Sequence, residues 1–116
     1  MTYEKIAVTG GAGLLGNHVV KLLSNHAAVT SIDINKPVAQ NQLPVKFIEA
    51  SITDFEEMKN ALRGHDALIH LAAIPNPREA SLELTFNTNV QGAWTVMQAA
   101  EEVGIKRIVV ASSDSV

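Results

Sequence analysis

The sequence has 116 residues, enough for one domain around a single hydrophobic core and too few for two. Hydrophobic residues make up 47% and charged residues 18% of the chain, a balance that argues against intrinsic disorder. The formal net charge of −3 argues against a nucleic-acid-binding surface, and the absence of cysteine excludes disulfides and thiolate metal sites.

The chain also lacks the signals of a membrane or secreted protein. Its first residues do not have the charged-then-apolar layout of a secretion signal, and no apolar run reaches the roughly 20 residues of a membrane-spanning helix. The four histidines show no metal-ligand spacing with a carboxylate partner. We therefore expect a cytoplasmic protein without a metal site that binds neither membranes nor nucleic acid.

Strand and helix patterns alternate along the first half of the chain. Residues 6–8 form a short apolar run before a glycine cluster, and apolar residues recur at helical spacing from 14 to about 25. Two further segments, 29–32 and 45–49, are expected to be strands. The polar residues 35–44 between them contain two prolines and are expected to form a loop.

The second half continues the alternation with a helix, a strand, a long helix and a final strand. They are expected at about 54–63, 67–71, 81–103 and 108–111. Thr53 or Asp54 is positioned to cap the first of these helices, and Gly104 to end the long one.

This order of elements predicts an α/β fold. Strands joined by helices form a parallel sheet, and the expected architecture is a three-layer, Rossmann-type doubly wound sheet with strand order 3-2-1-4-5. The fifth strand would then lie at an open edge of the sheet.

The sequence TGGAGLLG at residues 9–16 directly follows the first strand and directly precedes the first helix. Each glycine has a mechanical role in such a loop. Gly10 or Gly11 would allow the sharp turn out of the strand, Gly13 would let the backbone approach a diphosphate, and Gly16 would let the helix lie close to the sheet.

The N–H groups at Leu14, Leu15 and Gly16, together with the helix dipole, would hold the anion. The alternative is a glycine turn with no ligand. A P-loop is excluded because no Gly-Lys-Ser/Thr sequence follows.

Asp33 ends the second strand, 17 residues after Gly16. A carboxylate there can accept hydrogen bonds from both ribose hydroxyls of adenosine and repels a 2′-phosphate, which favours NAD over NADP. Lys36 nearby would soften this preference. The alternative role for Asp33 is that of a solvated loop residue.

Four segments, taken together, resemble the extended short-chain dehydrogenase/reductase family, which contains NAD-dependent epimerases and dehydratases. They are TGGAGLLG at 9–16, HLAA at 70–73, NVQG at 89–92 and ASSDSV at 111–116. The first three resemble the family patterns TGxxGxxG, HxAA and NVxG, and the last resembles the start of SSxxVYG. The matches occur in the family's order and cover essentially the whole chain.

The resemblance implies roles for single residues. The backbone of Leu71, Ala72 and Ala73 would pass beneath the cofactor. Ser113 would be the catalytic hydroxyl that bonds the substrate oxygen; alternatively, it caps the end of a strand. Asn89 would shape the long helix near the cofactor, or it is a structural residue that bonds the backbone.

The sequence departs from the family pattern after the third strand. The family usually has an acidic and then an apolar residue there, for the amino group and ring of adenine, whereas this chain has Ser51 and Ile52. A hydroxyl accepts a hydrogen bond more weakly than a carboxylate does. Asp54 could replace the missing carboxylate, but helix capping is its more natural role.

A second departure concerns the Tyr and Lys of the family's YxxxK motif. The only tyrosine is Tyr3, and no lysine follows Lys106. We therefore expect residues 1–116 to be an incomplete NAD(P)-binding Rossmann domain that lacks the catalytic pair and the substrate region and is inactive alone.

The resemblance implies the NAD-binding portion of an oxidoreductase, epimerase or dehydratase that acts on a sugar or sugar-nucleotide. The alternatives are a non-catalytic dinucleotide-sensing regulatory module, which needs no Tyr-Lys pair, and a folding unit whose open sheet edge associates with itself.

The long helix 81–103 carries a stripe of large apolar residues at helical spacing, namely Phe86, Val90, Trp94 and Met97. Core packing is the first interpretation of this stripe. The second is a homodimer contact, which the resemblance implies for this helix.

Overall fold

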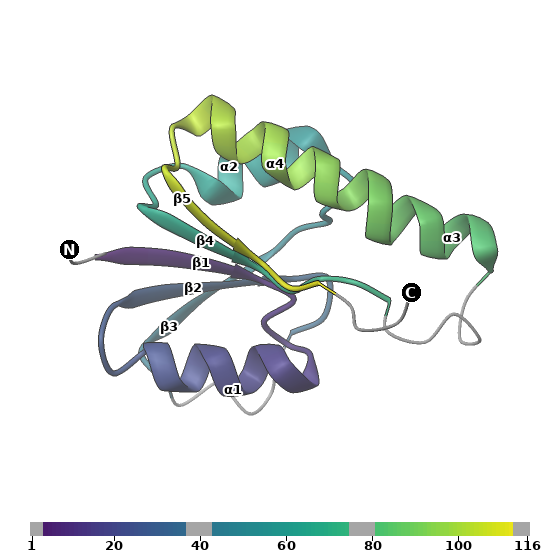
Figure 1. Ribbon diagram of the computed structural model, residues 1–116. Coiled ribbons are helices and arrows are strands. Elements are labelled where there is room, and N and C mark those ends of the chain that lie inside the picture. The colour runs from purple at the N-terminus through teal and green to yellow at the C-terminus, as the bar shows by residue number, and fades with distance from the viewer. Residues whose placement is uncertain (1–3, 37–42, 75–80, 113–116) are drawn as a thin grey trace.

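The computed structural model describes residues 4–36, 43–74 and 81–112 (Figure 1). Strands and helices alternate along most of the chain, as the sequence predicts. The elements are β1 (Lys5–Thr9), α1 (Leu14–Leu23), β2 (Ala28–Asp33), β3 (Val45–Glu49), α2 (Phe55–Leu62), β4 (Ala67–His70), α3 (Leu82–Phe86), η2 (Asn87–Gln91), α4 (Gly92–Val103) and β5 (Arg107–Val110).

The five strands form one parallel sheet in the order β3-β2-β1-β4-β5, which confirms the predicted topology. Helix α1 covers one face of the sheet, and α2 and α4 cover the other (Figure 1). The order of the chain reverses between β1 and β4, so the carboxyl ends of these two strands flank the position at which doubly wound sheets bind ligands.

Both faces of the sheet are covered, so the central strands are largely buried and contribute apolar residues to a core on each side. On the α2 and α4 side, the fully buried residues include Ile32, Met58, Leu62, Leu68 and Val96. On the α1 side, a smaller cluster is built on Val8, Val20 and Val29. Two hydrophobic layers therefore hold the sheet in place beneath the loops at its carboxyl edge.

The long helix is confirmed from Leu82 to Val103, but its middle turn, η2, is π-helical. A π turn carries one more residue per hydrogen-bonded ring than an α turn and is frequent at functional sites. Here η2 lies at the cavity described below and contributes Asn87, Thr88 and Gln91 to its wall.

The interpretation of the large apolar stripe as core is wrong for three of its four residues, since only Met97 is partly buried. Phe86, Val90 and Trp94 are 53%, 53% and 64% exposed. The buried face of α4 consists of smaller residues, namely Gly92, Thr95, Val96, Ala99 and Ala100. Small side chains let the helix axis approach its neighbours closely, so this stripe faces inward and the bulky one faces outward.

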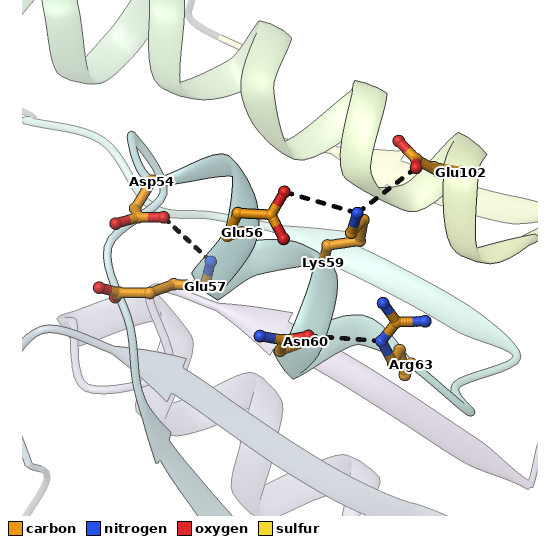
Figure 2. Close-up of polar contacts among 7 residues, drawn as sticks. All are labelled: Asp54, Glu56, Glu57, Lys59, Asn60, Arg63 and Glu102. Atoms are coloured by element: carbon orange, nitrogen blue, oxygen red, sulfur yellow. Dashed lines mark hydrogen bonds and ion pairs between the residues drawn. The ribbon is translucent and has the colours of Figure 1, made fainter.

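Charged side chains connect α2 to α4 at the surface. The ammonium group of Lys59 lies 3.5 Å from a carboxylate oxygen of Glu56 and 3.4 Å from one of Glu102 (Figure 2). Both glutamates are mostly exposed, so these ion pairs add little to the stability that apolar burial provides. Among the described residues, no helix has the length and apolar content needed to cross a membrane.

The two-sided core gives a direct stability prediction. Replacement of the fully buried Leu62 by alanine should lower the free energy of unfolding by about 2–5 kcal/mol, because it removes apolar contacts and leaves a cavity. The matched change Leu22→Ala, at a side chain that is 65% exposed, should change it by less than about 0.5 kcal/mol. Urea unfolding followed by circular dichroism measures both, and similar losses would contradict the assigned packing.

Candidate functional site

A cavity of about 650 Å³ lies at the carboxyl edge of the sheet, a size typical of small-molecule sites. Five parts of the chain surround it: the glycine loop, the segments around the ends of β2, β3 and β4, and the α3–η2 helix. Its lining residues are Gly10, Ala12, Gly13, Ile32, Asp33, Ile34, Asn35, Ala50, Ser51, Ile52, Thr53, Leu71, Ala72, Ala73, Ile74, Leu84, Asn87, Thr88 and Gln91.

The glycine loop depends on close backbone contacts. Gly10 has φ +72°, and a β-carbon there would lie 2.7 Å from the backbone nitrogen of Ala72. A β-carbon at residue 16 would overlap the carbonyl oxygen of Gly10. Gly10 therefore makes the turn out of β1, one of the two glycines predicted for it. Gly16 is predicted to let the helix lie close to the sheet, and its nearest neighbours are instead the loop residues Gly10 and Gly11.

The N-terminal end of α1, which we call its mouth, lies beside the cavity that Gly13 lines. Gly13 occupies the N-cap position and supplies no capping side chain. The first N–H groups of an α-helix have no partner inside the helix, and they carry the positive end of its dipole. The side chains of Leu14 and Leu15 are 86% and 58% exposed, so they point to solvent instead of filling this mouth.

The carboxylate of Asp33 lies against the glycine loop. One of its oxygens, Oδ2, accepts a hydrogen bond from the Ala12 N–H at 3.0 Å, and the other accepts from the Asn35 N–H at 3.1 Å. Two carboxylate oxygens offer about four acceptor positions. Asp33 can therefore hold the loop in place and still accept hydrogen bonds from a ligand in the cavity that it lines.

A buried polar pair lies where β1 and β4 end, next to the segment Leu71–Ile74, which forms the floor of the cavity. The Thr9 hydroxyl oxygen lies 2.6 Å from Nδ1 of His70 and accepts from the N–H groups of Leu71 and Ala72 at 3.2 and 3.4 Å. Because the oxygen already accepts, its proton donates to Nδ1, which places the imidazole proton on Nε2. Burial lowers the pKa of His70 below its usual value, so the ring is neutral at pH 7.

Asn89 connects the helix to the segment that follows β4. Its side-chain oxygen accepts from the Ile74 N–H at 2.7 Å, and its amide nitrogen donates to the Ile74 carbonyl at 3.0 Å. Asn89 does not line the cavity. Its contacts are those of a structural residue that fixes the floor segment Leu71–Ile74 against η2.

The far end of the cavity lies after β3. Asp54 caps α2 by accepting the Glu57 N–H at 3.0 Å, which confirms its expected capping role (Figure 2). Ile52 is 8% exposed and belongs both to the cavity wall and to the core. A β-carbon on Gly92 of α4 would lie 2.6 Å from Cδ1 of Ile52, so the helix and this wall are in close contact.

Most of the predicted cofactor-binding residues meet at this cavity. Those that line it are Gly10, Gly13, Asp33, Ser51, Ile52, Leu71, Ala72 and Ala73, whereas Leu14, Leu15 and Gly16 lie at the helix mouth. Ser113 lies outside the described residues. In the described part of the chain, no group of three or more His, Asp or Glu side chains is arranged to hold a metal ion.

Sequence reasoning missed several lining residues. Ala12, Ile34, Asn35, Ala50, Thr53 and Ile74 adjoin predicted site residues, so the rule that ligands lie beyond the carboxyl ends of strands could have found them. Leu84, Asn87, Thr88 and Gln91 belong to the helix, and no local pattern marks the face of a helix that borders a cavity.

A parallel sheet in the order β3-β2-β1-β4-β5, with a glycine loop between β1 and α1 at its carboxyl edge, defines a Rossmann-type domain. A model of the NAD dependent epimerase/dehydratase family matches residues 6–116. The chain therefore belongs to this family, as its four motifs indicate.

Three relatives illustrate the similarity. The chain is 33% identical to L-arabinose 1-dehydrogenase (NAD(P)(+)) of Haloferax volcanii, over 97% of the chain and 42% of that protein. It is 31% identical to human sterol-4-alpha-carboxylate 3-dehydrogenase, decarboxylating, over 97% of the chain and 30% of that protein. The structure of MoeE5 in complex with UDP-glucose and NAD matches with a TM-score of 0.85 and 29% identity, over 97% of the chain and 37% of that structure.

The chain thus spans less than half the length of each of these relatives. The family model's match to residues 6–116 spans the glycine loop and all the residues that line the cavity.

The buried histidine gives a pH prediction. The lowered pKa of His70 means that the unfolded chain binds its proton more readily than the folded one, so stability falls as the pH drops below the unfolded value of about 6.5. In His70→Asn, whose side-chain oxygen can accept from Thr9 without titrating, this part of the decline should disappear. Urea unfolding of both proteins from about pH 5 to about pH 8, which spans the unfolded pKa of histidine, measures the difference. Identical pH profiles would contradict the prediction.

Proposed function

We propose that the chain is the NAD-binding portion of an oxidoreductase, epimerase or dehydratase that acts on a sugar or sugar-nucleotide. The main support is the open mouth of α1 with the Asp33 carboxylate bonded to the adjacent loop. This places a site for an anion beside the cavity that Asp33 lines, where its carboxylate offers a site for hydroxyl groups.

The residues present fit NAD. The N–H groups of Leu14, Leu15 and Gly16 would hold the diphosphate, and Asp33 would accept the adenosine ribose hydroxyls. The absence of side chains at Gly10 and Gly16 lets the loop pack against the segment after β4 and against the start of α1, which brings these parts together at the cavity. When bound, NAD would supply a hydride acceptor, and the protein would orient it and shield it from water.

Leu71, Ala72 and Ala73 would form the floor beneath the dinucleotide, where Asn89 fixes the segment through Ile74. The buried Thr9–His70 pair holds the start of this segment through the N–H groups of Leu71 and Ala72. These contacts would keep the floor rigid, which lowers the entropy lost when a ligand binds.

Two of the relatives support a sugar-like substrate, because one is an arabinose dehydrogenase and another was solved with UDP-glucose. In this proposal, Ser113 is the hydroxyl that bonds the substrate oxygen. The exposed stripe of Phe86, Val90 and Trp94 supports a homodimer contact along the long helix, because exposed large apolar residues at helical spacing favour association.

The diphosphate site is tested by Gly13→Val. The backbone at Gly13 is extended, with φ −73° and ψ 175°, which valine can adopt. Its β-carbon would lie 3.3 Å from the Gly10 carbonyl oxygen, so the loop must shift slightly, and its side chain would stand at the mouth of α1. NAD affinity measured by calorimetry should fall at least about tenfold, a loss of about 1.4 kcal/mol. Lys21→Ala, in the last turn of the same helix, should leave the affinity unchanged. Unaltered binding by a folded Gly13→Val protein would refute the proposal.

The choice between NAD and NADP is tested by Asp33→Asn. The neutral amide no longer repels a 2′-phosphate, yet its oxygen can still accept the Ala12 N–H. The ratio of NADP to NAD dissociation constants should therefore fall several-fold by calorimetry. A ratio equal to that of the unaltered protein would mean that Asp33 does not select the cofactor.

A further inference from the structure

The second glycine of the loop, Gly11, has a role that the turn out of β1 does not explain. Among the described glycines, positive φ angles occur at Gly10, Gly64 and Gly104. The backbone of Gly11 therefore has no left-handed angle that would require glycine. A β-carbon at residue 11 would nevertheless overlap the hydroxyl oxygen of Ser31 and lie 3.0 Å from the Ser31 β-carbon. The space above β2, and not the backbone angle, requires glycine at this position.

Ser31 lies in the middle of β2, beneath the glycine loop. It is fully buried, and it pairs with Val8 of β1 and with Phe47 of β3. Side chains alternate between the two faces of a strand, so Ser31 shares the α1 side of the sheet with Val29 of the core cluster there. Rotation of the Ser31 hydroxyl alone would not make room for a side chain at residue 11, because the Ser31 β-carbon is itself too near.

The Ser31 hydroxyl makes its contribution through its size. Among the described residues, its oxygen has no hydrogen-bond partner although the side chain is fully buried. A buried polar atom without a partner costs free energy, because the hydrogen bonds that it makes to water in the unfolded chain are not replaced. The side chain therefore acts by filling the space between β2 and Gly11.

Neighbouring residues of β2 hold the loop on either side of Gly11. The Ile32 carbonyl accepts the Gly10 N–H at 2.8 Å, and the Asp33 carboxylate accepts the Ala12 N–H at 3.0 Å. Both hydrogen bonds require the loop to lie close to β2. The contact at Gly11 lies between them and decides how close the loop can come.

Gly11 also lies against the start of α1. A β-carbon on Gly16 would lie 2.9 Å from the Gly11 α-carbon, so little space separates the two backbones. If a side chain at residue 11 pushed the loop away from Ser31, the loop would move against Gly16 and shift the first turn of the helix. The N–H groups of this turn are those that would hold the diphosphate in the proposed function.

We propose that Ser31 is a positioning residue for the diphosphate site, which acts by setting the distance between the glycine loop and β2. This inference rests on the proposed function. Because Ser31 fills the space beneath the loop, NAD affinity depends on the combined size of the side chains at residues 11 and 31. Ser31 does not line the cavity, so it acts through the loop and not by contact with a ligand.

The test is calorimetric titration of NAD into variants at these two positions. Gly11→Ala should raise the dissociation constant at least about tenfold, which corresponds to about 1.4 kcal/mol, because the added methyl group pushes the loop off β2. Gly11→Ala combined with Ser31→Gly should recover most of the lost affinity, to within about threefold of the unaltered protein, since the second change restores the space.

A matched control uses the adjacent residue of the same strand. The Thr30 hydroxyl oxygen lies 2.8 Å from Nε2 of His65, on the face of β2 that lies away from α1. Gly11→Ala combined with Thr30→Gly should therefore keep the full loss of affinity, although it also places a glycine in β2. Thr30→Gly alone should leave NAD affinity near that of the unaltered protein.

The outcomes separate this inference from the cofactor assignment. Unchanged NAD affinity in Gly11→Ala, or no recovery in a folded Gly11→Ala/Ser31→Gly protein, would overturn the role of Ser31 and leave the NAD site standing. Equal recovery with Thr30→Gly would do the same. If Gly11→Ala alone does not fold, the addition of Ser31→Gly should restore both folding and NAD binding, and failure to do so would overturn the role. Failure of the unaltered protein to bind NAD would refute the NAD site and this inference together.

Discussion

The close approach of the glycine loop to its neighbours is the constraint on which the site depends. Gly10 turns the chain out of β1 directly beside the backbone of Ala72, and Gly16 lies against the carbonyl of Gly10. A β-carbon at either position would push apart β4, the loop or α1. Because these residues carry no side chain, the ends of β1 and β4 and the mouth of α1 meet at one edge of the cavity.

The second requirement is that the charged side chain of Asp33 is held in a fixed position at the same edge of the cavity. The Asp33 carboxylate bonds the loop at Ala12 and its own strand end at Asn35, so its position is fixed from two sides. On the opposite side, the neutral His70 and Thr9 hold the floor without adding charge. Among the described residues that line the cavity, Asp33 is the one charged side chain, and the dipole of α1 acts beside it.

The sequence was sufficient for the sheet and the loop because both depend on local patterns. Alternating apolar runs and helical periods predict the strand order, and the position of the glycines between β1 and α1 predicts the turn. The capping role of Asp54 was also predictable, since an N-cap is defined by its immediate neighbours.

Other features depend on contacts between distant segments. The long helix has a bulky and a small apolar stripe, and only its distance from α2 and the sheet decides which one is buried. In the same way, Ser51 is a weak acceptor when considered alone, and its pairing with Thr53 becomes evident only from the turn after β3.

The contact between Ile52 and Gly92 links the shape of the ligand cavity to the packing of α4, two properties that usually vary independently. Ile52 is at once a surface of the ligand cavity and a core residue under α4. A larger or smaller side chain there would reshape the ligand's surroundings and also move the helix. Evolution of ligand preference at this position is therefore restricted to side chains that the helix packing tolerates, and changes in thermal stability should accompany it.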